Sequence, residues 1–232
     1  MPLTLKDYLT SPLADIRTLY ARLDEPLAAL DCGQQCARHN PAGKPFCCDI
    51  CHAVPAAYPQ EWTFLQKTTN LWQPWRGDEC SQSDETRQLQ LEQPENMLYL
   101  ACLGPQACQR PFRALSCRQF PFFPYVSTDY RFLGLACEWE FESVCWVISH
   151  LEAVTEAYRH EFIATHDRLF ALEQDIFEAY AAHSEKMRAE FARTRRRIPL
   201  LHRDGGFRLI SPASERMARI SAAGLPRFGF YK

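Results

Sequence analysis

Cysteines gather in two short parts of the chain, and this clustering constrains the fold more than any other feature. The chain has 11 cysteines among 232 residues. The first group is Cys32, Cys36, Cys47, Cys48 and Cys51, and the second is Cys102, Cys108 and Cys117. An odd number of cysteines cannot pair completely within one chain. The adjacent Cys47 and Cys48 would close only a strained ring, whereas two adjacent thiolates can both face a metal.

The rest of the composition is that of an ordinary globular protein. Hydrophobic residues make up 47% and charged residues 23% of the chain, so disorder is not expected. No apolar run approaches the roughly 18 residues that span a bilayer, and the opening stretch "MPLTLKDYLTSPLADI" lacks the apolar segment of a secretory signal. We therefore expect a cytoplasmic protein with no membrane partner. In a reducing compartment, clustered cysteines indicate metal binding or redox chemistry rather than a disulfide framework.

Hydrophobic periodicity and turn residues predict an α+β fold. We expect residues 1–140 to form an irregular, cysteine-rich metal-binding core with short strands, packed against a helical part, 141–232, that ends in a basic hairpin and tail; the two parts should make one compact unit. The expected elements are helices over 11–24, from Pro59, over 144–162 and over 169–191, strands within 97–104 and 130–137, an extended non-helical segment over 118–126, a hairpin turning at 204–206, and a polar irregular insertion over 73–95.

The cysteine spacing predicts a metal site without identifying the metal. Zinc and iron–sulfur clusters are the usual occupants of all-cysteine sites. The first group reads Cys-x3-Cys, a ten-residue loop, then Cys-Cys-x2-Cys. This differs both from the paired Cys-x2-Cys units of a zinc ribbon and from the ferredoxin run Cys-x2-Cys-x2-Cys-x3-Cys-Pro. Cys80, Cys137 and Cys145 lie outside the groups, and we interpret them as small buried residues.

The order of these cysteines resembles that of the YkgJ-type cysteine-cluster family, which is named for a CxxCxxCC signature and described as zinc- or iron-chelating. Cys32, Cys36, Cys47 and Cys48 stand where that signature would be. Cys102, Cys108 and the run "RALSCRQFPF" resemble the family's second half, Arg-Pro-x-x-Cys-Arg-x-Phe-Pro. The first gap is three residues rather than two, the second is ten, Ala114 replaces the usual proline, and Cys51 is an extra thiol.

The resemblance, which covers residues 30–140, implies iron or an iron–sulfur cluster as cofactor, with zinc as the alternative. The implied metal ligands are Cys32, Cys36, Cys47, Cys48, Cys51, Cys102, Cys108 and Cys117. One branch of the family comprises flagellin lysine methylases, so a redox or group-transfer role is one implication. The sequence has no nucleotide-binding glycine loop and no Gly-x-Ser-x-Gly or His-Glu-x-x-His motif. Whether the protein is an enzyme, which residues would be catalytic, and which protein or small-molecule substrate it meets all stay open.

Charge is unevenly distributed along the chain. Residues 183–232 carry twelve Lys and Arg against four Asp and Glu, whereas the whole chain has a net charge of −2. This asymmetry allows a second interpretation, in which a structural zinc site supports a binding module whose basic C-terminal region engages an anionic partner. It is equally consistent with attraction between the halves of the chain. We do not expect nucleic-acid binding from "RTRRR" at 193–197, since cations at a helix C-terminus are favourable on their own.

Two arginines flank the last clustered cysteine. The positive charge of Arg113 and Arg118 could offset thiolate charge, or it could serve ion pairs elsewhere. Because Cys117 lies 69 residues after Cys48, a shared site requires the chain to fold back. We therefore predict that the second group of cysteines faces the loop of the first group.

Overall fold

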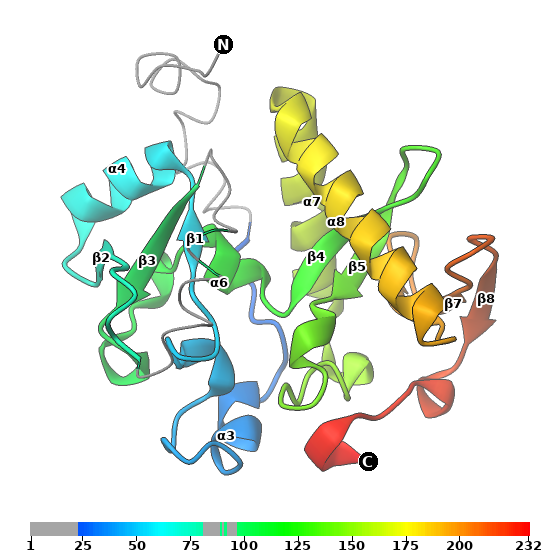
Figure 1. Cartoon of the computed structure of the whole chain (residues 1–232), viewed down its shortest axis with the longest axis horizontal. Coiled ribbons are helices and arrows are strands. Elements are labelled where there is room, and N and C mark those ends of the chain that lie inside the picture. The colour runs from blue at the N-terminus through cyan, green and yellow to red at the C-terminus, as the bar shows by residue number, and fades with distance from the viewer. Residues whose placement is uncertain (1–22, 81–88, 90, 92–96) are drawn as a thin grey trace. The chain divides into compact units, whose positions relative to one another are not determined.

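The computed structural model describes residues 23–80, 89, 91 and 97–232, and these form two compact units. Unit 1 contains 36–118, and unit 2 contains 23–35 and 119–232, within the described ranges. Each unit has its own antiparallel sheet (Figure 1). The fold is thus mixed helix and sheet, as the α+β prediction requires. The predicted helix over 11–24 falls almost wholly outside the described residues.

Unit 1 is built on a short three-stranded sheet in the order β1-β3-β2. The strands are β1 (Ala56–Ala57), β2 (Trp72–Pro74) and β3 (Leu98–Cys102), and α4 (Pro59–Thr68) connects β1 to β2. Proline suits the first turn of a helix because no intrahelical bond needs its missing N–H, and α4 begins at Pro59 as predicted. The other short elements are α3 (Cys32–Ala37), η2 (Phe46–Cys48), η3 (Pro105–Ala107), η4 (Arg110–Phe112) and α6 (Leu115–Gln119).

Unit 2 contains a five-stranded sheet in the order β4-β5-β6-β7-β8. Its strands are β4 (Phe122–Val126), β5 (Phe132–Cys137), β6 (Ile198–His202), β7 (Phe207–Ile210) and β8 (Met217–Ile220). Strand β5 and the β6–β7 hairpin match their predictions, and β4 lies in the segment that was predicted to be extended, whereas β8, which has no buried residue, was not predicted. Since β5 pairs with β6, the predicted boundary near residue 140 differs from the observed one after Arg118.

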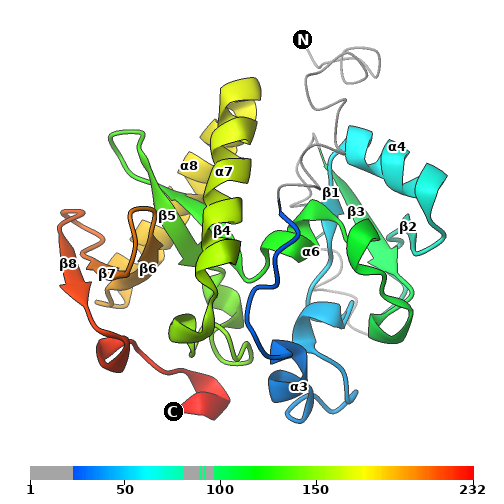
Figure 2. The ribbon, with the colours of Figure 1, turned by 180° about the vertical axis from the view of Figure 1, so that it is seen from behind.

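Two long helices cover opposite faces of this sheet. Helix α7 (Glu156–Leu172) and helix α8 (Gln174–Arg193) lie on different sides of β4 and β5 (Figures 1 and 2). Successive side chains of a strand point to opposite faces. Accordingly, Phe122 meets Tyr158 of α7 with ring centroids 6.2 Å apart, and Phe123 meets His183 of α8 at 4.4 Å. Both faces of β4 are therefore buried, which explains its unbroken apolar sequence.

The predicted helix over 144–162 is only partly present. Residues 144–154 form turns and the 3-10 segment η6 (Leu151–Ala153), and α7 begins after Thr155, whose hydroxyl accepts from the amide of Tyr158 at 3.1 Å. Val147, Ile148 and Leu151 are buried, so their spacing reflects burial rather than helix. A capping hydroxyl followed by an acidic residue is a helix-start signal, and this signal at Thr155-Glu156 outweighs the longer apolar pattern.

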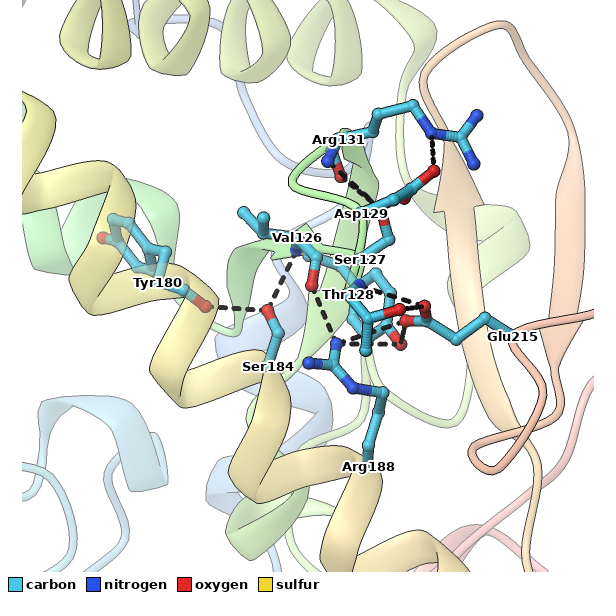
Figure 3. A network of polar contacts seen from close by, with 10 residues as sticks. Val126, Ser127, Thr128, Asp129, Arg131, Tyr180, Ser184, Arg188 and Glu215 are labelled. Carbon is cyan, nitrogen blue, oxygen red and sulfur yellow. Dashed lines mark hydrogen bonds and ion pairs between the residues drawn. The ribbon is translucent and has the colours of Figure 1, made fainter.

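A buried ion pair joins α8 to the sheet and to the β7–β8 connection (Figure 3). The Arg188 guanidinium donates to the Val126 carbonyl at 2.8 Å and lies 3.3 Å from the Glu215 carboxylate. Tyr125 donates its hydroxyl to Glu215 at 3.1 Å, and burial raises the pKa of Tyr125 to about 12. The Ser184 hydroxyl accepts from the Val126 amide at 2.9 Å. The backbone N–H and C=O of Val126, the last residue of β4, are thus both bonded to side chains of α8.

The basic C-terminal region makes ion pairs inside unit 2. Arg196 contacts Glu142 at 2.6 Å, Arg203 contacts Asp167 at 2.9 Å, and Arg227 contacts Glu152 at 2.7 Å. Arg193 pairs with Glu190 along α8 at 2.7 Å. These pairs support internal attraction as the reason for much of the charge asymmetry, with the acidic partners coming from residues 138–190 rather than from the cysteine-rich region. In the described part of the chain, no helix is long and apolar enough to cross a membrane.

We predict that Gly134→Ala destabilises unit 2 by more than about 3 kcal/mol, because it combines a steric clash with a strained backbone. Gly134 has φ +145°, and an added Cβ would lie 2.1 Å from the Leu201 carbonyl oxygen in β6. Urea unfolding measures the effect. Gly224→Ala is the matched control, since its Cβ would meet its nearest neighbour at 3.7 Å; an equal loss in both variants would contradict the prediction.

We also predict that acid destabilises unit 2 through His166. Its ring is fully buried, with Nδ1 2.8 Å from the Phe162 carbonyl oxygen, and burial lowers the pKa of His166 to about 4. Below pH 6.5 the unfolded chain binds a proton at His166 that the folded protein excludes, so the free energy of unfolding decreases as the pH is lowered. Between pH 7 and pH 5 the wild type should lose about 2 kcal/mol more than His166→Gln. Parallel loss in both proteins, measured by urea unfolding, would refute this.

Candidate metal centre

The first group of cysteines lies on α3 and η2. Cys32 and Cys36 are one helical turn apart on α3, and Cys47 and Cys48 are the last two residues of η2. The division between the units falls within α3, so Cys32 is grouped with unit 2 and Cys36 with unit 1. Cys36 is buried, and the side chain of Phe46 anchors η2 in the core of unit 1.

The Asp49 carboxylate fixes the loop that presents Cys47 and Cys48. It accepts from the Asn40 side-chain amide at 3.1 Å and from the Cys51 backbone amide at 3.2 Å, and it lies 3.1 Å from the Lys44 ammonium. Burial raises the pKa of Asp49, but the bonds from Asn40, Lys44 and Cys51 outweigh it, so the pKa is lowered overall. Asp49 is therefore a structural anion at neutral pH.

Cys51 does not join the predicted ligands in this structure, because it forms a disulfide with Cys80. The two Cα atoms are 5.6 Å apart. The turn before Cys80 is ordered by Glu79, whose carboxylate accepts from the amides of Arg76 at 3.1 Å and Gly77 at 2.8 Å. Sequence reasoning assigned Cys51 to a metal and Cys80 to ordinary burial, and it missed this pair because the two residues are 29 positions apart.

The second group lies on three short consecutive segments. Cys102 ends β3, where it pairs with Trp72 of β2, Cys108 follows η3, and Cys117 lies in α6. Two prolines and a glycine, at Pro105, Pro111 and Gly104, break the chain between them into single turns. Short turns of this kind can direct several thiols toward one place.

Side-chain donors hold the backbone between Cys108 and Cys117. The Arg118 guanidinium donates to the carbonyls of Arg113 at 3.1 Å, Arg110 at 3.2 Å and Pro111 at 3.0 Å. The remaining carbonyl, of Phe112, accepts from the Trp72 indole at 2.7 Å. Four consecutive carbonyls are thus bonded. The planar fork of arginine suits this task, so Arg118 positions the loop.

A buried carboxylate holds the start of α6. Glu61, in the first turn of α4, is fully buried and accepts from the Leu115 amide at 2.6 Å and from the Tyr58 amide at 3.3 Å. Its two oxygens satisfy donors at the starts of two helices, where backbone N–H groups lack intrahelical partners. A glutamate at the third position of a helix is a capping signal, but nothing in the sequence indicated that Glu61 also bonds to α6.

The structure brings thiols of the two groups into one electrostatic neighbourhood around Arg113. The Arg113 Nε donates to the Cys108 sulfur at 3.1 Å. Although burial lowers it, the pKa of Arg113 is raised overall by Cys108, Cys48 and Cys117. Burial, followed by Cys48 and Cys108, raises the pKa of Cys102. Burial, Cys102 and Cys48 likewise raise that of Cys117 strongly. Cys48 of the first group therefore interacts electrostatically with Cys102 and Cys117 of the second, as expected if the chain folds back between the two groups.

These thiols are not arranged as a finished metal site. Among the described residues, no three His, Cys, Asp or Glu side chains are grouped so that they could hold a metal ion. Thiolate ligands lie about 2.3 Å from zinc, so the sulfurs would have to move closer together by changing rotamer. The donor set itself, all thiol with a guanidinium beside it, has the chemistry that soft or borderline metals prefer.

The remaining candidates have structural roles. Cys137 is buried in unit 2, and burial together with Cys145, Glu142 and Glu138 raises its pKa. Phe122, Phe123 and Tyr125 are fully buried in unit 2. His52 lies 4.0 Å from Asp49 and packs on Phe46.

Comparison with known proteins does not extend these observations, since no protein-family model, curated protein or solved structure matches the chain.

We predict that Glu61→Gln destabilises unit 1 by about 1–3 kcal/mol, because an amide offers one oxygen where two donors must be satisfied. Circular dichroism during urea unfolding measures this loss. Glu25→Gln is the control; Glu25 is exposed. A neutral Glu61→Gln would show that the carboxylate does not hold the two helix starts.

Proposed function

We propose that this protein binds a metal through thiolates contributed by both groups of cysteines. Cys48, Cys102, Cys108 and Cys117 are the central ligand candidates, and Cys36 and Cys47, which also belong to unit 1, are additional ones. The observation that carries the proposal is the convergence of Cys48 with Cys102 and Cys117 from segments separated by at least 54 residues of sequence. Ordinary packing does not require four thiols and a guanidinium to share one neighbourhood.

Arg113 supports the proposal through its charge. A cation beside a thiol favours the thiolate, which is the form that binds metals. Arg113 donates to Cys108 and interacts with Cys48 and Cys117, while its loop is held by Arg118 and Trp72. Arg113 thus lowers the pKa of Cys117, although burial, Cys102 and Cys48 raise it more. Since the sulfurs lie near each other but not in ligand geometry, metal binding would complete the fold of unit 1.

An iron–sulfur cluster or iron is the proposed cofactor, with zinc as the alternative. A bound iron–sulfur cluster would supply electron-transfer or group-transfer chemistry, and zinc would stabilise the fold. The resemblance of residues 30–140 to the YkgJ-type family supports a chelating role. The proposal further includes a redox or methylation-like activity on a protein or small-molecule substrate. It also includes a cytoplasmic location for the protein.

The alternative function, a zinc-supported module that engages an anionic partner through residues 183–232, has weaker support. Arg188, Arg193, Arg196, Arg203 and Arg227 already contact carboxylates within unit 2. Fewer cations thus remain for a macromolecular partner than the sequence suggests. The same pairing supports the expectation that nucleic acid is not the partner.

We predict that protein purified without oxygen contains metal, and that Cys102→Ser and Cys117→Ser each remove at least half of it. Loss of one thiolate leaves an incomplete coordination shell. Elemental analysis measures the metal, and a broad absorbance near roughly 400 nm distinguishes an iron–sulfur cluster from colourless zinc. Cys145→Ser, in unit 2, is the matched control and should keep full metal content. Metal-free wild-type protein, or equal loss in Cys145→Ser, would refute the proposal.

We further predict that Cys80→Ser leaves metal content unchanged, because Cys80 pairs with Cys51 rather than with the central ligand candidates. The measurement is elemental analysis of anaerobic protein, with Cys117→Ser as the contrasting variant. Halved metal content in Cys80→Ser would show that Cys80 or its disulfide partner belongs to the site.

A further inference from the structure

The turn of the β6–β7 hairpin in unit 2 is surrounded by guanidinium groups. It consists of Asp204, Gly205 and Gly206, and the two glycines have φ values of +101° and +68°. A Cβ on Gly205 would lie 3.5 Å from Nη2 of Arg159 in α7, and a Cβ on Gly206 would lie 3.5 Å from Nη1 of Arg208 in β7. Two cations therefore contact the part of the turn that carries no side chains.

Arg159 is a buried and incompletely satisfied cation. The residue is 6% exposed, and burial lowers its pKa. Its Nη2 contacts the carboxylate of Glu156, a side chain that is 67% exposed. Within the described residues, its buried Nε has no hydrogen-bond partner. A buried guanidinium normally has several charged or polar acceptors. The exposed Glu156 carboxylate therefore compensates the positive charge of Arg159 only in part.

Arg208 adds to the excess of positive charge. It lies directly opposite Arg219 in the β7–β8 pair, and like charges at directly opposed positions destabilise a sheet. The neighbouring Arg203 is already paired with Asp167 at 2.9 Å. Asp204 is the acidic residue of the turn, but its side chain is 80% exposed and its charge is largely screened by water.

The hairpin also presents neutral donors at the same place. Nδ1 of His202 accepts from the Asp204 amide at 3.1 Å, which leaves the proton of the neutral ring on Nε2. Burial, followed by Arg208, lowers the pKa of His202, and Arg203 and Arg159 act in the same direction. The ring is therefore uncharged at pH 7 and can donate from Nε2.

We propose that this turn, with Arg159, Arg208 and His202 around it, binds a small oxyanion of two negative charges, of the phosphoryl class. The absence of side chains on Gly205 and Gly206 lets an anion approach the backbone closely. Forked guanidinium donors match the oxygens of a phosphoryl group. Arg208 of β7 and Arg219 of β8 are both cations at this paired position. A bound dianion would screen their mutual repulsion. This site is independent of the proposed metal function, and both free phosphate and a phosphate monoester have the required chemistry.

Calorimetric titration with inorganic phosphate, at constant ionic strength, tests the proposal on the full chain. Wild-type protein should bind one phosphate, and Arg208→Gln should bind it at least tenfold more weakly. Phenyl phosphate in a parallel titration distinguishes the two sources, because stronger binding than inorganic phosphate indicates a monoester. Arg168→Gln is the matched control: it removes an exposed cation of α7 and should bind phosphate as the wild type does.

Several results would overturn the proposal. The first is that the wild type binds no phosphate at a concentration of about 10 mM, ten times a millimolar dissociation constant. The second is that sodium chloride gives the same heat of titration as phosphate. The third is that Arg168→Gln and Arg208→Gln weaken phosphate binding equally. Arg208→Lys serves if Arg208→Gln does not fold, since lysine keeps the charge and loses the fork; it should weaken phosphate binding by a smaller factor than Arg208→Gln. Arg219→Gln removes the charge repulsion that a bound dianion would screen, so it should also weaken phosphate binding. Unaltered binding in both Arg208→Lys and Arg219→Gln would also overturn the proposal.

Discussion

The buried carboxylate of Glu61 is the contact on which the arrangement of unit 1 depends. It connects the start of α4 to the start of α6, and α6 carries Cys117. A buried carboxylate is costly unless it accepts several hydrogen bonds, and here backbone amides supply them. Arg118 and Trp72 extend the same logic to the loop before α6. The segments that carry the thiols are thus held by polar contacts beside the buried apolar side chains of unit 1, among them Leu65 and Leu100.

Unit 2 is organised differently, with a sheet between two helices. Its core on the α8 side is apolar and includes Phe123, Phe191 and Leu200. The polar contacts lie at the ends of its strands, where Arg188 and Ser184 bond to the backbone of Val126. Several of the arginines that make the C-terminal region basic in sequence attach its segments to the rest of unit 2, as Arg196, Arg203 and Arg227 do, so net charge alone was a poor guide to a partner.

Local patterns predicted much of the fold. The start of α4, strands β3 and β5, the extended conformation of β4 and the hairpin at Gly205-Gly206 follow from proline, short apolar runs and turn chemistry. The sequence could not reveal β8, because its exposed residues have no apolar pattern, or the non-helical character of 144–154, where burial imitates helical spacing. The approach of Cys48 to Cys102 and Cys117 agreed with the fold-back prediction. The Cys51–Cys80 pair and the second bond of Glu61 depend on tertiary contacts, which no local pattern encodes.

The order of the strands along the chain bears on how unit 2 folds. Strand β5 ends at Cys137 and its neighbour β6 begins at Ile198, so both α7 and α8 are inserted between two paired strands. Closing so long a loop is entropically slow, whereas each helix forms from local contacts. The helices would then act as a folded spacer that brings β6 beside β5. During synthesis one edge of β5 stays unpaired until β6 has emerged from the ribosome, and an unpaired strand edge can pair with another chain.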